Sequence, residues 1–174
     1  MSIPTTAGLD TGTWTLDPLG SSVEFQVRML YGLMTVKGRF DRYHGTLNLS
    51  ERPAIALTIE AASLNTDNDR RDTHLRSPDF FDVAHHPEIR FESDAADLAD
   101  GTLKVRGLLY AAGGYTPVDV DAVVRECGDE LEIEATALVD QRELGMTWSP
   151  LRVISVPSRL TVRGRLDRIS RSPR

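Results

Sequence analysis

The chain has 174 residues and a mass of 19.3 kDa, enough for one domain and too little for two. Apolar residues make up 40% and charged residues 26% of the sequence, a balance typical of soluble globular proteins. The 26 acidic and 20 basic side chains give a net charge of −6, which disfavours nucleic acid and anionic membrane surfaces as partners.

The single cysteine and the N-terminal residues indicate the compartment. Cys127 has no second cysteine with which to form an internal disulfide. Residues 1–8 show neither the positive charge nor the apolar run of a secretory signal. Among the longest apolar runs is 108–112, far short of the roughly 20 residues of a spanning helix. We therefore expect a cytoplasmic protein without stable membrane insertion.

Alternating apolar and polar residues predict β-strands along most of the chain, since successive side chains of a strand point to opposite faces. The predicted strands cover residues 13–17, 22–30, 34–49, 54–62, 88–98, 102–111, 115–126, 130–140 and 156–168. The first is short and is interpreted as an extension of the second, which gives about eight strands. Asp100-Gly101 and Gly128-Asp129 are typical of tight antiparallel hairpins. His44-Gly45 and Gly113-Gly114 are interpreted as bends or bulges inside longer strands.

Two segments interrupt the strands. In the first, Asp67 or Asn68 is a candidate cap for a short helix over 69–76, and Ser77-Pro78-Asp79 is typical of a second helix start. The second segment, 141–154, is irregular. We expect residues 1–12 and 169–174 to be tails of one domain over 13–168.

Strand length favours a barrel. A strand over 34–49 would extend about 50 Å, against roughly 17–20 Å for a typical strand. Long antiparallel strands that curl usually close into a barrel, because closure removes the exposed edges. An eight-stranded barrel is filled by its own side chains or encloses one small ligand, and periodicity alone also leaves a two-sheet sandwich open.

The most specific block of motifs runs from Ala62-Ser63-Leu64-Asn65-Thr66 through Arg71-Asp72-Thr73-His74-Leu75 and Ser77-Pro78-Asp79-Phe80-Phe81-Asp82 to Pro87-Glu88-Ile89-Arg90-Phe91-Glu92-Ser93. In order and spacing this block resembles the YceI-like family of lipocalin-like, polyisoprenoid-binding proteins. The resemblance implies an all-β, eight-stranded antiparallel lipocalin-like barrel with a short helical element near one end. It also implies non-catalytic binding, sequestration or transport of a long-chain isoprenoid or another amphiphile with an apolar tail.

Under this resemblance, the apolar residues of one strand phase and of the helical segment are predicted to line a tunnel, with Phe80 and Phe81 covering one end and Trp148 near the same opening. The predicted ligand-binding residues are Phe25, Val27, Met29, Val36, Phe40, Leu57, Ile59, Leu75, Phe80, Phe81, Phe91, Leu109, Met146 and Trp148. Arg71, His74 and Arg142 are candidates for contact with a polar head group.

Two other hypotheses stay open. One is an enzyme that uses the same cavity with a metal held by His74 and neighbouring acids, although the spacing of His74, His85 and His86 matches no metal motif. The other is a solid-core barrel that acts through its surface, in stress response or as a homodimer. We expect no metal and no cofactor, and neither Cys127 nor the acid pairs indicate catalysis.

Overall fold

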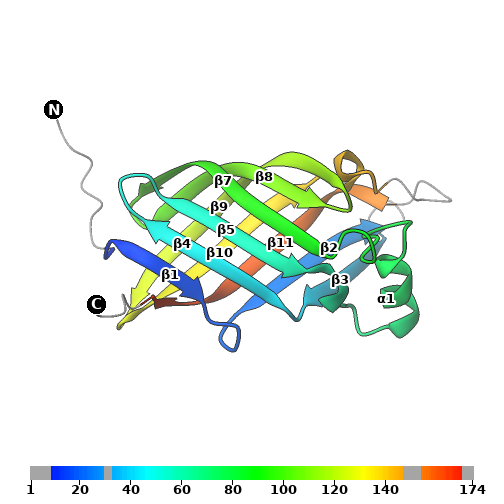
Figure 1. The fold of residues 1–174 in the computed structure, drawn as a ribbon, viewed down its shortest axis with the longest axis horizontal. Coiled ribbons are helices and arrows are strands. Elements are labelled where there is room, and N and C mark those ends of the chain that lie inside the picture. The colour runs from blue at the N-terminus through cyan, green and yellow to red at the C-terminus, as the bar shows by residue number, and fades with distance from the viewer. Residues whose placement is uncertain (1–8, 30–32, 147–153, 170–174) are drawn as a thin grey trace.

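The strands of the computed structural model form an antiparallel barrel that carries one α-helix at one end (Figure 1). The structure describes residues 9–29, 33–146 and 154–169, with the backbone alone at Met29 and 154–156. Within these ranges no helix is long and apolar enough to cross a membrane. The strands are β1 (Gly12–Leu16), β2 (Ser22–Met29), β3 (Met34–Phe40), β4 (Tyr43–Leu49), β5 (Ala54–Glu60), β6 (Leu64–Asn65), β7 (Glu88–Ala99), β8 (Thr102–Ala111), β9 (Gly114–Cys127), β10 (Glu130–Val139) and β11 (Ile154–Arg168). The helices are α1 (Asp69–Arg76) and the 3-10 turns η2 (Ala61–Ser63) and η3 (Gln141–Leu144).

Eight strands close the barrel, as the sequence predicts. They follow one another in the order β1-β4-β5-β7-β8-β9-β10-β11, and β1 also pairs with β11. β11 is long enough to pair with β1 at residues 166–168 and with β2 at residues 154–163. β2 in turn pairs with β3, which continues toward β4. The wall beside β11 is therefore built by β1 and β2 in succession.

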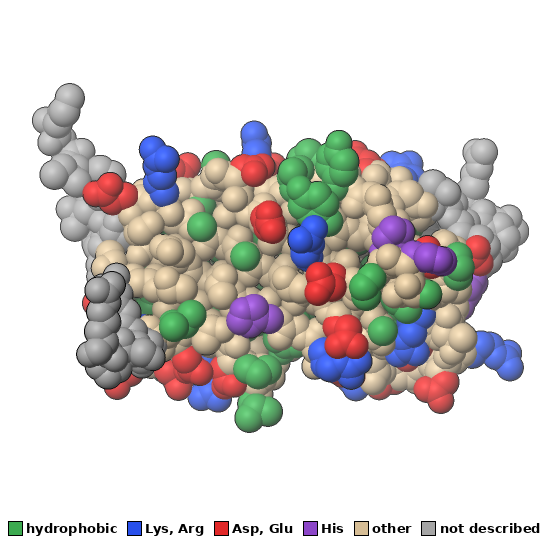
Figure 2. Space-filling model, in the orientation of Figure 1, with side chains coloured by type: hydrophobic (Ala, Val, Ile, Leu, Met, Phe, Trp, Pro, Cys, Tyr) green, Lys and Arg blue, Asp and Glu red, His purple; other side chains and the backbone are tan. Residues whose placement is uncertain are grey.

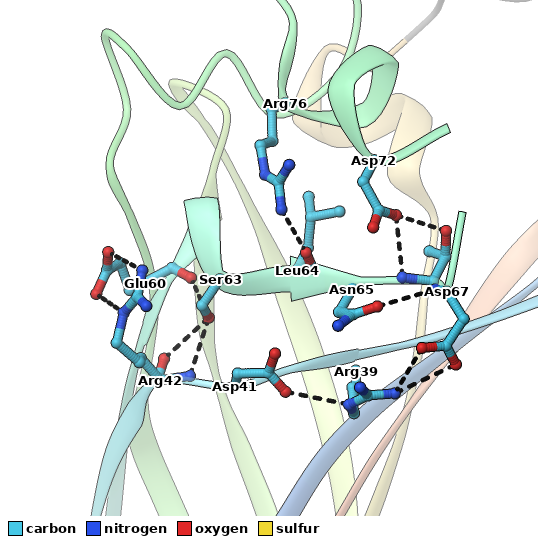
Figure 3. A network of polar contacts seen from close by, with 11 residues as sticks. Arg39, Asp41, Arg42, Glu60, Ser63, Leu64, Asn65, Asp67, Asp72 and Arg76 are labelled. Carbon is cyan, nitrogen blue, oxygen red and sulfur yellow. Dashed lines mark hydrogen bonds and ion pairs between the residues drawn. The ribbon is translucent and has the colours of Figure 1, made fainter. Parts of the chain in front are cut away.

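The predicted strand over 34–49 is wrong in one respect, because it breaks at Asp41 and Arg42. There the backbone turns to η2: the Asp41 N–H donates to the Ser63 carbonyl at 3.1 Å and the Arg42 N–H to Ser63 Oγ at 3.0 Å (Figure 3). Just before the break β3 pairs with β6 at Arg39 and Phe40, whereas after the break β4 pairs with β5. His44-Gly45, expected to form the bend, lies inside β4.

The second predicted helix, starting at Ser77, is also absent from the described residues. α1 ends at Arg76, its C-cap Ser77 is extended with ψ 167°, and the following residues form turns. The Asp82 N–H donates to the Ser77 carbonyl at 2.9 Å, and Asp82 has φ 46°, a left-handed conformation that ends a helix. The signals at Ser77-Pro78-Asp79 therefore cap a turn instead of starting a helix.

The hairpin between β8 and β9 corrects a third expectation. Ala112 and Gly113 have φ 51° and 79°, so they form a two-residue turn, and Gly114 already pairs with Ala111. Asp100 and Gly101 adopt the same left-handed pair of conformations, which confirms the hairpin predicted there.

The alternation of side chains follows the sequence pattern. On β8 Leu103, Val105 and Leu109 are buried, while Lys104 and Arg106 are exposed. Charged side chains of both signs are spread over the face of the barrel seen in Figure 2. One apolar phase of each long strand therefore faces the barrel interior.

Candidate ligand-binding site

The barrel interior contains two apolar cavities that share part of their walls. The inner one, near the middle of the barrel, has a volume of about 100 Å³. The outer one, beneath α1 and η3, has a volume of about 200 Å³. Four residues line both: Ile59, Ile89, Leu109 and Leu160. The two cavities therefore meet at one level of the barrel.

The inner cavity offers a ligand almost no polar contact. Its wall is formed by residues of all eight barrel strands and of β2, such as Leu57, Phe91, Val118, Ala135 and Val162. Such a surface binds hydrocarbon and excludes charged groups, since a charge placed there loses its hydration without compensation.

Aromatic rings form one side of the outer cavity. Phe25 and Phe40 have ring centroids 5.3 Å apart, and Phe81 meets Phe40 edge to face at 6.0 Å. Phe25 lies across the strand pair from Gly38, and a side chain at Gly38 would overlap its ring. The glycine thus lets Phe25 lie flat on the wall, where it extends the apolar surface of the cavity.

The helix α1 covers the outer cavity because buried polar contacts fasten it to residues 62–66. Asp72 is buried and accepts hydrogen bonds from the Thr66 N–H at 3.0 Å and the Thr66 hydroxyl at 2.5 Å. Arg76 donates to the carbonyls of Ala62 at 2.9 Å and Leu64 at 2.8 Å (Figure 3). With its N-cap formed by Asn68, which accepts from the Arg71 N–H, the helix has a fixed position over the mouth.

The second cover of the outer cavity, η3, is fixed from β9. The Thr116 hydroxyl is hydrogen-bonded to the Glu143 carboxylate. Gly114 lies so close to η3 that a Cβ would stand 2.8 Å from the Leu144 carbonyl oxygen. Because only glycine permits this approach, Leu144 and Met146 reach the cavity wall.

Of the described residues, four with polar side chains line the outer cavity: Arg71, His74, Gln141 and Ser158. The Arg71 guanidinium donates to the hydroxyl and to the carbonyl of Thr66, both at 2.8 Å, and forms no ion pair with a carboxylate in the described chain. His74 Nε2 lies 3.4 Å from Asp79 Oδ2. Ser158 donates to Gln141 Oε1 at 3.0 Å. Among the described residues, charged or ionisable side chains thus line the outer cavity and not the inner one.

Most predicted ligand-binding residues lie on the cavity walls. Leu57 and Phe91 line the inner cavity and Ile59 and Leu109 line both, whereas those on the outer wall alone are Phe25, Val27, Val36, Phe40, Leu75, Phe80, Phe81 and Met146. The Met29 side chain and Trp148 lie outside the described residues. Their role in binding stays a prediction.

Of the three head-group candidates, two line the outer cavity and one does not. Arg71 and His74 line the outer cavity, but Arg142 lines neither cavity. Its guanidinium is mostly exposed and pairs with Asp140, with Nη2 2.7 Å from Oδ2. The hydrogen bond from the Arg142 side chain lowers the pKa of Asp140. Asp140 caps η3 by accepting from the Arg142 N–H, and the Arg142 side chain folds onto this cap instead of lining the cavity.

The sequence interpretation missed several lining residues. Ile89 is two residues before Phe91 and shares its strand phase, so the alternation would have predicted it. Val139, Leu144 and Leu160 belong to the same apolar surface. Gln141 and Ser158 lie in polar or irregular sequence, and no pattern distinguishes them from surface residues.

In the turns that follow α1, His85 and His86 pair with Asp82 and do not form a metal site. His85 Nδ1 lies 2.9 Å from Asp82 Oδ1, and His86 Nε2 lies 3.9 Å from Asp82 Oδ2. The hydrogen bond and charge of Asp82 raise the pKa of His85. Within the described residues no three His, Cys, Asp or Glu side chains are grouped to hold a metal ion.

The sequence is similar to a known protein family and to curated relatives in other bacteria. The YceI-like domain profile matches residues 14–166. A UPF0312 protein of Vibrio cholerae is 30% identical over 129 residues, which cover 70% of this chain and 67% of the relative. A UPF0312 protein of Staphylococcus aureus is 36% identical over 101 residues, covering 55% of this chain and 58% of that one.

Two solved structures share the fold. BcnA of Burkholderia cenocepacia superposes with a TM-score of 0.79 at 16% identity, covering 87% of this chain and 98% of BcnA. A polyisoprenoid binding domain from Saccharophagus degradans, implicated in plant cell wall breakdown, superposes with a TM-score of 0.73 at 17% identity. That match covers 92% of this chain and all of that domain.

Proposed function

The chain belongs to the YceI-like family, and from this premise we propose that it binds or carries a long-chain isoprenoid or another amphiphile with an apolar tail inside its barrel, without catalysing a reaction. The observation that carries the proposal is the pair of apolar cavities that meet at Ile59, Ile89, Leu109 and Leu160. The name of the Saccharophagus degradans domain, a polyisoprenoid binding domain, supports the same class of ligand.

The energetics of such binding come from the tail. Burying one methylene stabilises a complex by roughly 0.8 kcal/mol, so about twelve methylenes contribute on the order of 10 kcal/mol. Association and ordering of the tail reduce this gain, and a nanomolar Kd needs about 12 kcal/mol net. A tail longer than twelve carbons, or a tail with a bound head group, is therefore needed for tight binding.

The head group is expected in the outer cavity, near α1. Arg71 and His74 are the charged or ionisable side chains of its wall, and Gln141 and Ser158 add polar atoms. Because the Arg71 guanidinium is held by Thr66 and not by a carboxylate, it stays available to a ligand oxygen. An oxygen-bearing head group, such as a carboxylate or a hydroxyl, fits this wall better than a cationic one.

Native mass spectrometry of the protein purified from its own source tests the proposal. The expected result is a stoichiometric lipid, which organic extraction then identifies by its tail and head group. A mass equal to that of the polypeptide, combined with no uptake of added isoprenoid alcohols or fatty acids, would contradict it. A homodimer is a separate prediction, which sedimentation of the same preparation measures directly.

A further inference from the structure

Four apolar side chains of the described residues lie where the two cavities of the barrel meet. Ile59 of β5, Ile89 of β7, Leu109 of β8 and Leu160 of β11 belong to the walls of both cavities. Ile59, Ile89 and Leu109 are buried, and Ile59 pairs directly with Ile89 across the two strands. We call these four residues the waist. A tail whose head group lies in the outer cavity must pass the waist to reach the inner cavity.

Small side chains create the space beyond the waist. Ala135 and Ala137 of β10 point into the barrel and are 8% and 9% exposed, and Gly45 of β4 lines the same cavity. Larger side chains at these inward positions would fill the cavity, as leucine does at Leu131 on the same strand. The inner cavity is thus a consequence of residue size at a few positions and not of a different fold.

The inner cavity also has a floor. Leu47 of β4 and Leu166 of β11 line its wall, and Leu131 of β10, which pairs with Leu166, belongs to the core cluster and is almost completely buried. A tail that reaches these side chains has no further room, because a packed interior does not admit an extra methylene without strain. The length of tail that the protein can bury is therefore finite.

From this arrangement we infer that the waist and the small inward residues of β10 determine which tail lengths the protein selects. The inference rests on the proposed function and adds its specificity. Each methylene that becomes buried raises affinity about fourfold, whether it lies in the outer or in the inner cavity. Affinity rises with tail length until the tail reaches the floor, and additional carbons then add nothing or weaken binding. We call the tail length at which affinity stops rising the break. A larger side chain that fills the inner cavity should move the break to shorter tails.

The experiment measures the Kd of saturated fatty acids with 8 to 20 carbons for the wild type and for two variants, Ala135→Leu and Ala135→Phe. The constant carboxylate holds the head group fixed while the tail changes. The control is Glu134→Leu, because Glu134 is the next residue of the same strand and points outward. Thermal unfolding of each variant establishes that it is folded. If the larger side chain of Ala135→Phe prevents folding, Ala135→Leu still tests the inference because it adds less volume.

The expected result is a break in the wild-type series that moves to shorter tails in Ala135→Leu. Acids shorter than the new break keep their Kd within about twofold, and the longest acids lose at least tenfold. Glu134→Leu keeps the wild-type break. An equal loss for short and long acids, or an unchanged break in both Ala135 variants, overturns the inference while leaving the proposed function intact. If no acid of any length binds the wild type, the inference on tail length is overturned, and native mass spectrometry decides the proposed function separately.

Discussion

β1 and α1 lie at opposite ends of the barrel (Figure 1). Toward β1 the inward side chains are large and fill the space between them, whereas toward α1 the same kind of strand wall encloses two cavities. At the filled end Trp14, Leu49, Leu103 and Leu131 belong to the buried core, and none of them lines a cavity. Alternation of buried and exposed side chains runs through both regions, with a register shift in β7 between Ser93 and Ala95. The comparison teaches that the strand pattern specifies the barrel, while residue size and the covering segments decide where it is hollow.

The largest contrast between the two regions is expected in stability. Leu103→Ala removes a fully buried side chain from the filled end, and we expect it to lower the free energy of unfolding by about 3–5 kcal/mol. Leu109→Ala, the same change on the same strand, removes a side chain that already faces two cavities, so its cost should be at the low end, about 2 kcal/mol. Urea unfolding of both variants measures the difference. Equal losses would mean that the cavities are closed in solution.

A charge in the hollow region should separate binding from folding. Phe25→Glu or Phe91→Glu places a carboxylate on a cavity wall, and we expect at least 100-fold weaker binding of a neutral isoprenoid alcohol such as farnesol. The neutral probe removes charge repulsion by a head group as an explanation. Gln26→Glu, next to Phe25 on the same strand but on its other phase, is the control and should bind normally. Unchanged binding in both Phe variants would contradict the assignment of the walls.

The cover of the hollow region depends on one buried carboxylate. Asp72→Ala leaves the Thr66 N–H and hydroxyl without their acceptor, and we expect a loss of about 1–3 kcal/mol in unfolding free energy. Hydrogen exchange of residues 69–76 should accelerate more than that of β8, because the loss is local to α1. Asp69→Ala changes an exposed acid of the same helix and serves as the control. Uniform acceleration over the whole barrel would show that α1 is not a separate cover.

The smallest effect concerns pH. Asp82 raises the pKa of His85 above its ordinary value of about 6.5, so the folded state binds this proton more tightly than the unfolded state. The stabilisation is complete below about pH 6.5 and is lost as the pH rises through the folded-state pKa. In Asp82→Asn, which tolerates the left-handed backbone at this position, NMR titration should give a lower His85 pKa. An unchanged titration curve would rule out the pair as the cause.

The sequence was sufficient for the barrel but not for its interruptions. Alternation predicts the strands because each has one buried face, and Asp100-Gly101 predicts its hairpin because both residues tolerate positive φ. The break at Asp41 was missed because Ser63, from a distant segment, supplies the backbone contacts that cause it. Ser77-Pro78 has the local chemistry of a helix start, but contacts with Leu75 and Ser77 fold the residues that follow into turns.

The cavity walls show the same division. Phe25 and Leu109 were predictable from strand phase, and Ile89 would have been by the same argument. Arg71 and Arg142 are both next to acids in sequence, yet only Arg71 lines the cavity, because Arg142 folds back onto Asp140. Such a choice depends on which partner a flexible side chain finds in three dimensions. Sequence spacing does not contain that information.

The pairing of β11 has a consequence for synthesis of the chain. This strand pairs with β10 on one side and with β1 and β2 on the other, and Trp14 pairs with Arg168, 154 positions later. The barrel therefore cannot close on the ribosome until residues 154–168 have emerged, and three strands keep an unpaired edge until then. Contacts of such long sequence separation also slow folding. A newly made chain thus passes through an open sheet whose apolar face is exposed to other chains. Only after β11 has paired does the closed barrel keep that face for a ligand.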